Sequence, residues 1–145
     1  MSKRAKSAGA SRFAPHAPRF QGMAVVVLAD QMASNVYPWQ ELCAREGLVL
    51  VVLPKPSAPH SWASLVVGEV ARRAGGAGTV LAVAVPHVHW CDGSLVDLEA
   101  IGRCCRAHST GALGSGLDSD SVFLAVDGTQ VRVSRPSSGC PSSAH

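Results

Sequence analysis

Four short apolar runs divide the chain, and longer segments of mixed polarity lie between them. The runs are residues 23–29, 48–53, 79–85 and 122–126, and Val, Leu and Ala dominate each of them. Apolar residues without polar alternation are typical of strands that are covered on both faces of a parallel sheet. The pattern therefore predicts four strands, the first three of them buried on both faces.

Three helices are predicted between these strands, over residues 39–46, 61–74 and 94–108. For the first, Ser34 or Asn35 is the candidate N-cap, Pro38 suits the first turn, residues 39–46 continue the helix and Gly47 ends it. The second repeats apolar residues at helical spacing from Trp62 onward, and a run of glycines ends it. The third begins with Ser94 as its N-cap, and Asp97 stands three residues later as in a capping box.

Strands that alternate with helices predict an α/β fold with a parallel sheet. Right-handed crossovers then place the carboxyl ends of all strands at one edge of the sheet. Ligands of open α/β sheets bind at that edge, so residues that directly follow a strand are the first candidates for a site.

Length and composition indicate one domain with two unstructured tails. The chain has 145 residues, and residues 1–22 carry five basic residues and no acidic one. We interpret 1–22 as a disordered basic tail, 23–130 as the domain and the Ser/Pro-rich 131–145 as a second disordered tail. Residues 109–122 are Gly-rich and polar, which predicts a loop insertion. The +3 net charge thus belongs to the tail, and the domain lacks the basic face that nucleic-acid binding requires.

The apolar runs and the cysteines indicate where in the cell the protein is expected. No apolar run reaches the roughly 18 residues that a membrane-spanning helix needs, so we expect no membrane partner. Five cysteines occur without C-x-x-C spacing, which favours a reducing compartment, the cytoplasm. A plastid or mitochondrion is the alternative if residues 1–22 act as a transit peptide. We expect Cys104 and Cys105 to pack on a helix; a thiol or metal site with His87 and His89 is the alternative that zinc uptake would reveal.

Three segments carry a family resemblance when they are taken in order. They are residues 34–39 (SNVYPW), 87–93 (HVHWCDG) and 126–130 (VDGTQ). Together they resemble the middle of the large domain of class V aminotransferases, the pyridoxal phosphate family of cysteine desulfurases, related lyases and isopenicillin N epimerase-like enzymes. The resemblance spans about residues 24–130. It implies part of a fold-type-I large domain, pyridoxal phosphate as cofactor and an amino acid as substrate for desulfuration, elimination, epimerisation or transamination.

The resemblance also assigns cofactor-binding roles to four residues. Asp127 corresponds to the carboxylate that pairs with the pyridinium nitrogen, and Gln130 to the contact with the phenolic oxygen of the ring. Trp90 stands where many members have Asn, and Ala33 stands where desulfurases have a ring-stacking His. A carboxylate that keeps the pyridinium protonated makes the ring an electron sink. Without the resemblance, Asp-Gly after a strand indicates only a turn, and His87 and His89 indicate edge histidines, one bonded to a backbone carbonyl.

The chain departs from the family pattern where catalysis would need it most. Its lysines are Lys3, Lys6 and Lys55, and none follows Asp127, where the family has its Schiff-base lysine. Residues 1–22 also lack the helix start that binds the cofactor phosphate. We therefore expect a fragment that is inactive alone and has no catalytic residue. The alternatives are a non-catalytic α/β domain that binds a partner or a second copy through an exposed sheet edge, and a cut sheet that does not fold stably.

Overall fold

The computed structural model describes residues 20–109 and 121–130. The predicted tails and most of the predicted insertion lie outside these ranges, so those predictions are not tested. The described elements follow in the order β1 (Ala24–Leu28), α1 (Ala33–Glu46), β2 (Val49–Leu53), α2 (Trp62–Arg72), the π turn η1 (Arg73–Ala77), β3 (Val80–Pro86), α3 (Leu98–Ala107) and β4 (Phe123–Asp127).

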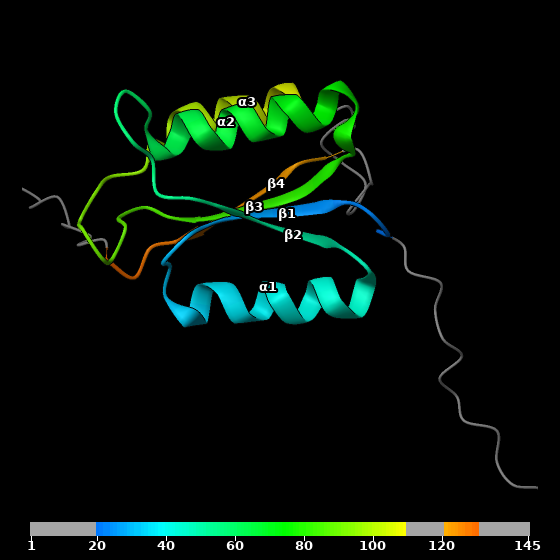
Figure 1. Cartoon of the computed structure of the whole chain (residues 1–145), viewed down its shortest axis with the longest axis horizontal. Coiled ribbons are helices and arrows are strands. Elements are labelled where there is room, and N and C mark those ends of the chain that lie inside the picture. Colours follow the sequence, from blue (N-terminus) through cyan, green and yellow to red (C-terminus); the bar gives the residue numbers. More distant parts are fainter. Residues whose placement is uncertain (1–19, 110–120, 131–145) are drawn as a thin grey trace, which may run out of the picture.

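All four strands form one parallel sheet in the order β2-β1-β3-β4. Helices α2 and α3 lie side by side on one face of the sheet, and α1 covers the other face (Figure 1). The predicted α/β fold with a parallel sheet is therefore confirmed. Its topology places the carboxyl ends of β1, β3 and β4 next to one another, as the alternation of strands and helices requires.

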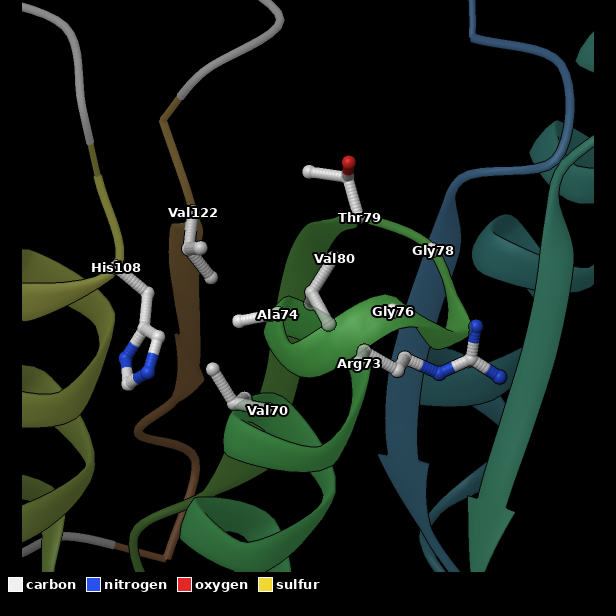
Figure 2. Close-up of a pocket in the computed structure, with 9 residues that line it drawn as sticks. All are labelled: Val70, Arg73, Ala74, Gly76, Gly78, Thr79, Val80, His108 and Val122. Atoms are coloured by element: carbon white, nitrogen blue, oxygen red, sulfur yellow. The ribbon is translucent and has the colours of Figure 1, made fainter.

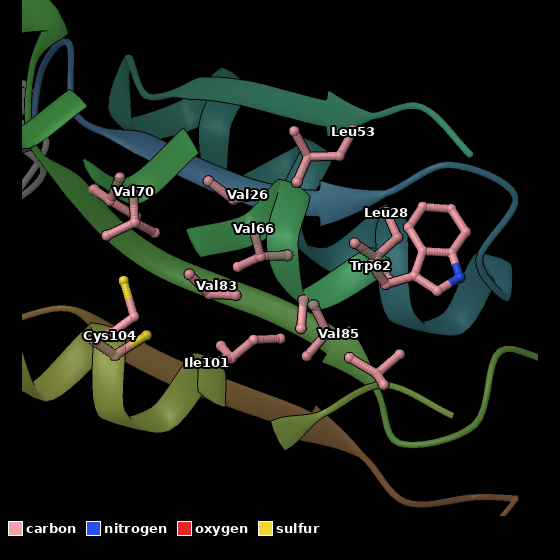
Figure 3. Packing of buried hydrophobic residues seen from close by; sticks show 14 residues of the cluster. Val26, Leu28, Leu53, Trp62, Val66, Val70, Val83, Val85, Ile101 and Cys104 are labelled. Atoms are coloured by element: carbon pink, nitrogen blue, oxygen red, sulfur yellow. The ribbon is translucent and has the colours of Figure 1, made fainter. Parts of the chain in front are cut away.

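The two faces of the sheet have cores of different size. Beneath α2 and α3, branched residues of the sheet such as Val26, Val83 and Val85 pack against Val66 and Ile101 of the helices (Figure 3). The face under α1 is smaller, and its buried residues are Val25, Val27, Cys43, Leu48, Leu81, Ala82 and Ala84. Cys104 and Cys105 are both buried in the larger core, which confirms their predicted packing role.

The prediction that the second strand is buried on both faces is wrong. β2 lies at an edge of the described sheet, and its residues Val49 and Val52 are exposed. An edge strand has a neighbour on one side only, so the helices on the two faces cover less of it. The composition of an apolar run does not distinguish an edge strand from a central one.

The start of α1 was also predicted incorrectly. The helix begins at Ala33, with Met32 rather than Ser34 or Asn35 as its N-cap, and Pro38 lies inside it rather than at its first turn. A proline removes one backbone donor, and here the carbonyl that loses its partner belongs to the exposed residue Ser34. The predicted end is confirmed, because Gly47 adopts the left-handed conformation with φ 68° and ends the helix.

The predicted start is confirmed for α2 and wrong for α3. Ser61 caps α2 in a reciprocal capping box with Ser64. For α3 the cap is Asp97, whose side chain accepts from the Ala100 amide at 2.9 Å, and not Ser94. No helix in the described ranges is long and apolar enough to cross a bilayer.

Candidate functional site

Asp127 lies at the carboxyl edge of the sheet, as the last residue of β4. Its Oδ1 accepts hydrogen bonds from the amide of Thr129 at 2.9 Å and from the Thr129 hydroxyl at 2.6 Å. Within the described residues no group donates to its other oxygen, Oδ2. The backbone carbonyl of Asp127 accepts from the His87 amide at 3.0 Å, which joins the exits of β4 and β3. The carboxylate is therefore held in place with one oxygen left for a ligand.

Trp90 follows β3 and leans across to the loop that leaves β1. Its indole Nε1 donates to the carbonyl oxygen of Asp30 at 2.5 Å, and the thiol of Cys91 lies 3.4 Å from the same oxygen. The side chain of Trp90 is about half exposed, at 52%. Because its single N–H is already used, Trp90 offers a ligand the ring itself rather than a hydrogen-bond donor.

The other two predicted site residues are exposed. Ala33 is the first residue of α1 and directly follows the loop that Trp90 contacts. Gln130 lies in the turn after β4, three residues beyond Asp127, with no hydrogen bond to the described residues. The structure thus brings Trp90 to the loop before Ala33 and places Asp127 on the strand next to β3.

His89 is the buried residue at this edge, with 1% of its surface exposed. Its Nε2 lies 3.0 Å from the carbonyl oxygen of Ala29, and its ring stacks on Trp62 with centroids 4.9 Å apart and planes 15° from parallel. This arrangement confirms the interpretation of one edge histidine bonded to a backbone carbonyl. No group of three or more His, Cys, Asp or Glu side chains with the spacing of a metal site occurs in residues 20–109 and 121–130.

Asp92 connects the exits of β2 and β3 with the start of α2, and sequence reasoning missed it. Its Oδ2 pairs with the ammonium of Lys55 at 2.8 Å, while its Oδ1 accepts from the amide and the hydroxyl of Ser94 at 3.0 and 2.7 Å. Trp62 donates from Nε1 to the same Ser94 hydroxyl at 3.1 Å. The hydrogen bonds from Lys55 and then from Ser94 hold the pKa of the Asp92 carboxyl well below its usual range. The only local signal was the spacing of Asp92 and Ser94, which suits an Asx turn.

The described residues fit one end of pyridoxal phosphate. Asp127 suits a pyridinium nitrogen, since its position at a strand end and its open Oδ2 meet that need. The other end of the cofactor needs a lysine and a phosphate cradle. Lys55 is the one lysine in the described ranges, and its ammonium already pairs with Asp92, which raises its pKa. The described residues therefore offer no unpaired lysine for the covalent anchor.

A pocket of about 420 Å³ opens at the opposite, amino-terminal end of β3 and β4. It is lined by Val70, Arg73, Ala74, Gly76, Gly78, Thr79, Val80, His108 and Val122. Figure 2 shows Arg73 and His108 on opposite sides of Ala74 and Val80, so their nitrogens do not converge. Arg73 pairs with Glu69 at 2.7 Å, and Nδ1 of His108 lies 2.9 Å from the carbonyl oxygen of Cys104. This pocket is separate from the carboxyl edge and does not contain the predicted site.

Comparison with known proteins bears on the fold. No family model matches the chain, and no curated protein sequence matches it. Among solved structures it matches a lysine-to-alanine mutant of C-DES with glycine covalently linked to its pyridoxal phosphate cofactor, at 21% identity and a TM-score of 0.57. It also matches the cystine C-S lyase C-DES in complex with its product cysteine persulfide, at 20% identity and a TM-score of 0.58. Each match covers 77% of this chain and 26% of the other.

The chain therefore spans about a quarter of the length of the solved structures that it matches. An identity near 20% shows the fold alone, and the fold agrees with the expectation from the sequence. The four-stranded parallel sheet with helices on both faces has the fold of part of a fold-type-I, pyridoxal phosphate-dependent lyase.

Proposed function

We propose that this chain is part of a pyridoxal phosphate-dependent enzyme of the class V aminotransferase type, acting on an amino acid by desulfuration, elimination, epimerisation or transamination. The observation that carries the proposal is Asp127, a carboxylate fixed through Oδ1 at the carboxyl end of β4 with Oδ2 open. The likeness in fold to C-DES supports this proposal. One of the matched C-DES structures holds pyridoxal phosphate, and the other holds cysteine persulfide, the reaction product of C-DES.

In this proposal the chain's own residues bind and orient the pyridine ring. Asp127 accepts a hydrogen bond from the ring nitrogen and holds the proton there, because an adjacent carboxylate favours the charged form. Trp90 forms a wall beside the ring, and Gln130 contacts the phenolic oxygen. The cofactor, when bound, supplies the electron sink for chemistry at the amino-acid carbon.

We further propose that these 145 residues do not turn over an amino acid by themselves. The sequence contains Lys3, Lys6 and Lys55, and no lysine follows Asp127. Lys55 is ion-paired with Asp92. The covalent anchor and the phosphate cradle would then have to come from other residues.

The experiment is an absorbance titration of the purified chain with pyridoxal phosphate, followed by borohydride reduction and mass analysis. We expect weak, non-covalent binding that Asp127→Asn abolishes, because Asn keeps the Oδ1 acceptor for Thr129 but removes the negative charge. Glu41→Gln, at an exposed position on α1, is the matched control and should leave binding unchanged.

Two outcomes would contradict the proposal, each at a different point. A reduced adduct on a single lysine would show that the chain does hold a covalent anchor. Equal binding by wild type and Asp127→Asn would show that the carboxyl edge is not the ring site.

A partner-binding domain is the second candidate function, and the edge strands favour it. Val52 on β2 and Phe123 and Val126 on β4 are exposed by 45–53%. Exposed apolar strand edges promote pairing with another chain. In this case the occupant is a second copy, and light scattering should give twice the mass of one chain. Phe123→Lys should return it to a monomer, whereas a monomeric wild type would reject this candidate.

A further inference from the structure

His89 carries the one buried side-chain nitrogen or oxygen that lacks a hydrogen-bond partner in the described ranges. Its Nε2 faces the carbonyl oxygen of Ala29 at 3.0 Å. A carbonyl only accepts, so Nε2 must carry a proton, and in the neutral ring Nδ1 then presents a lone pair. That lone pair lies 3.6 Å from Oδ1 of Asp92, which is also an acceptor. Two acceptors therefore face each other, one on the buried His89 ring and one on the partly exposed Asp92 carboxylate.

The surroundings of the ring favour a positive charge at this position. The face of Trp62 lies parallel to the imidazole at 4.9 Å, where an indole attracts a cation. Asp92 is held ionised by Lys55 on its Oδ2 and by Ser94 on its Oδ1.

Other charged groups lie near the pair formed by His89 and Asp92, and their effect on a positive charge at His89 differs. Lys55, from the loop after β2, opposes a charge on His89, but it reaches the far oxygen of Asp92. The Asp30 carboxylate also acts on the Lys55 ammonium and partly offsets its charge. The ring itself contacts Trp62 at the start of α2 and Ala29 in the turn after β1, which bring no further charge.

We propose that His89 is a proton-dependent latch that joins the exits of β1 and β3 to the start of α2. One proton from solvent adds to Nδ1, and the new N–H donates to Oδ1 of Asp92, with the two atoms closing to about 2.8 Å. The Nε2–H bond to Ala29 is kept, and no bond breaks. The site gains a charge-assisted hydrogen bond and loses its facing pair of acceptors.

The latch makes the anchoring of the loop at residues 90–94 depend on pH. Only the folded chain has Asp92 and Trp62 in place beside the ring, so the added hydrogen bond exists only in the folded chain. It fixes residues 90–94 whether or not the edge binds a cofactor, so it does not rest on the proposed function.

The test is long-range proton–nitrogen NMR of the imidazole rings in the full chain, with His89 assigned by a His89→Gln variant. At pH 8 we expect the neutral ring with its proton on Nε2. On acidification we expect a second proton on Nδ1, at a shift that indicates a hydrogen bond. The exposed His60 provides the internal reference.

Asp92→Asn and Asp30→Asn form the matched pair of variants, since each removes one negative charge from the same edge. At a fixed pH we expect Asp92→Asn to lower the ratio of protonated to neutral His89 about tenfold, because a contacting carboxylate favours the charged form by at least that factor. Asp30→Asn should change the ratio less than about threefold, because the contact that Asp30 makes at this edge is through its backbone carbonyl, which accepts from Trp90.

Several results would overturn the latch. They are a pH 8 ring with its proton on Nδ1, equal effects of the two Asn variants, or a His89 that stays neutral at a pH where His60 is fully protonated. Should Asp92→Asn fail to fold, the wild-type spectra alone decide, since they report the tautomer and the second proton directly.

Discussion

Truncating Ile101 tests whether the layer of α2 and α3 on the sheet is the main stabilising core. Ile101 on α3 is fully buried, at 0% exposure, and packs among residues of α2 and β3 (Figure 3). Ile101→Ala removes three carbons, which at about 0.8 kcal/mol for each buried carbon amounts to about 2.4 kcal/mol. The cavity left behind adds to this loss, so we expect a decrease of about 2–5 kcal/mol in the free energy of unfolding.

The matched control is Leu95→Ala, which removes the same number of carbons from a residue that is 72% exposed. We expect a change within about 0.5 kcal/mol for this variant. Urea unfolding followed by far-ultraviolet circular dichroism measures both, with an unchanged m-value as the sign that only stability differs. If Ile101→Ala does not fold, Ile101→Val should still cost about 0.5–1.5 kcal/mol. A difference below about 1 kcal/mol between Ile101→Ala and Leu95→Ala would refute the packing of α3 on the sheet.

Two further predictions follow from glycine geometry and from buried thiols. Gly47→Ala should destabilise the chain by about 1 kcal/mol, because φ 68° is costly for a residue with a side chain. Gly68→Ala should stabilise it by about 0.5–1 kcal/mol, because this helical glycine has open space around it. Urea unfolding should therefore show changes of opposite sign in the free energy of unfolding, and changes of equal sign would contradict the C-cap. Burial raises the pKa of Cys105 to about 11, so at pH 8 only about a thousandth of it is thiolate. Iodoacetamide should then label the exposed Cys91 first and the peptide with Cys104 and Cys105 only after denaturant is added, as peptide mass analysis would show; early labelling of that peptide would mean that α3 does not stay docked.

The strands were predictable because their signal is local. Runs of Val, Leu and Ala located each strand within one residue at either end, and the alternation with helices determined the parallel sheet. Asp127 was placed at the carboxyl edge by the same argument, since it directly follows the last run. The start of α1 was placed too late because Pro38 suggested the first turn, whereas the helix begins at Ala33. The α1 helix is instead stabilised by Trp39, Leu42 and Cys43 packing on the sheet, a tertiary effect that local propensity does not report.

The network around His89 was not predictable from local sequence. Its parts come from separate segments, with Lys55 after β2, Trp62 at the start of α2 and Asp92 after β3. Ser94 was assigned to the wrong role because a serine before a helix suits both an N-cap and a turn with an earlier aspartate. Here Asp92 accepts both Ser94 donors, and Asp97 is left to cap α3.

The strand order has a consequence for the synthesis of the chain. Of the four described strands β1 leaves the ribosome first, yet it is a central one, and Ala24 pairs with Val49 on one side and with Val80 on the other. At roughly 5–20 residues per second, several seconds pass between the two partners. During that interval β1, α1 and β2 exist as a two-stranded unit in which one edge of β1, formed entirely by apolar residues, is unpaired. Non-local pairing of this kind is slow and exposed to aggregation, so a chaperone that binds short apolar strands would have its greatest effect on nascent chains that end between β2 and β3.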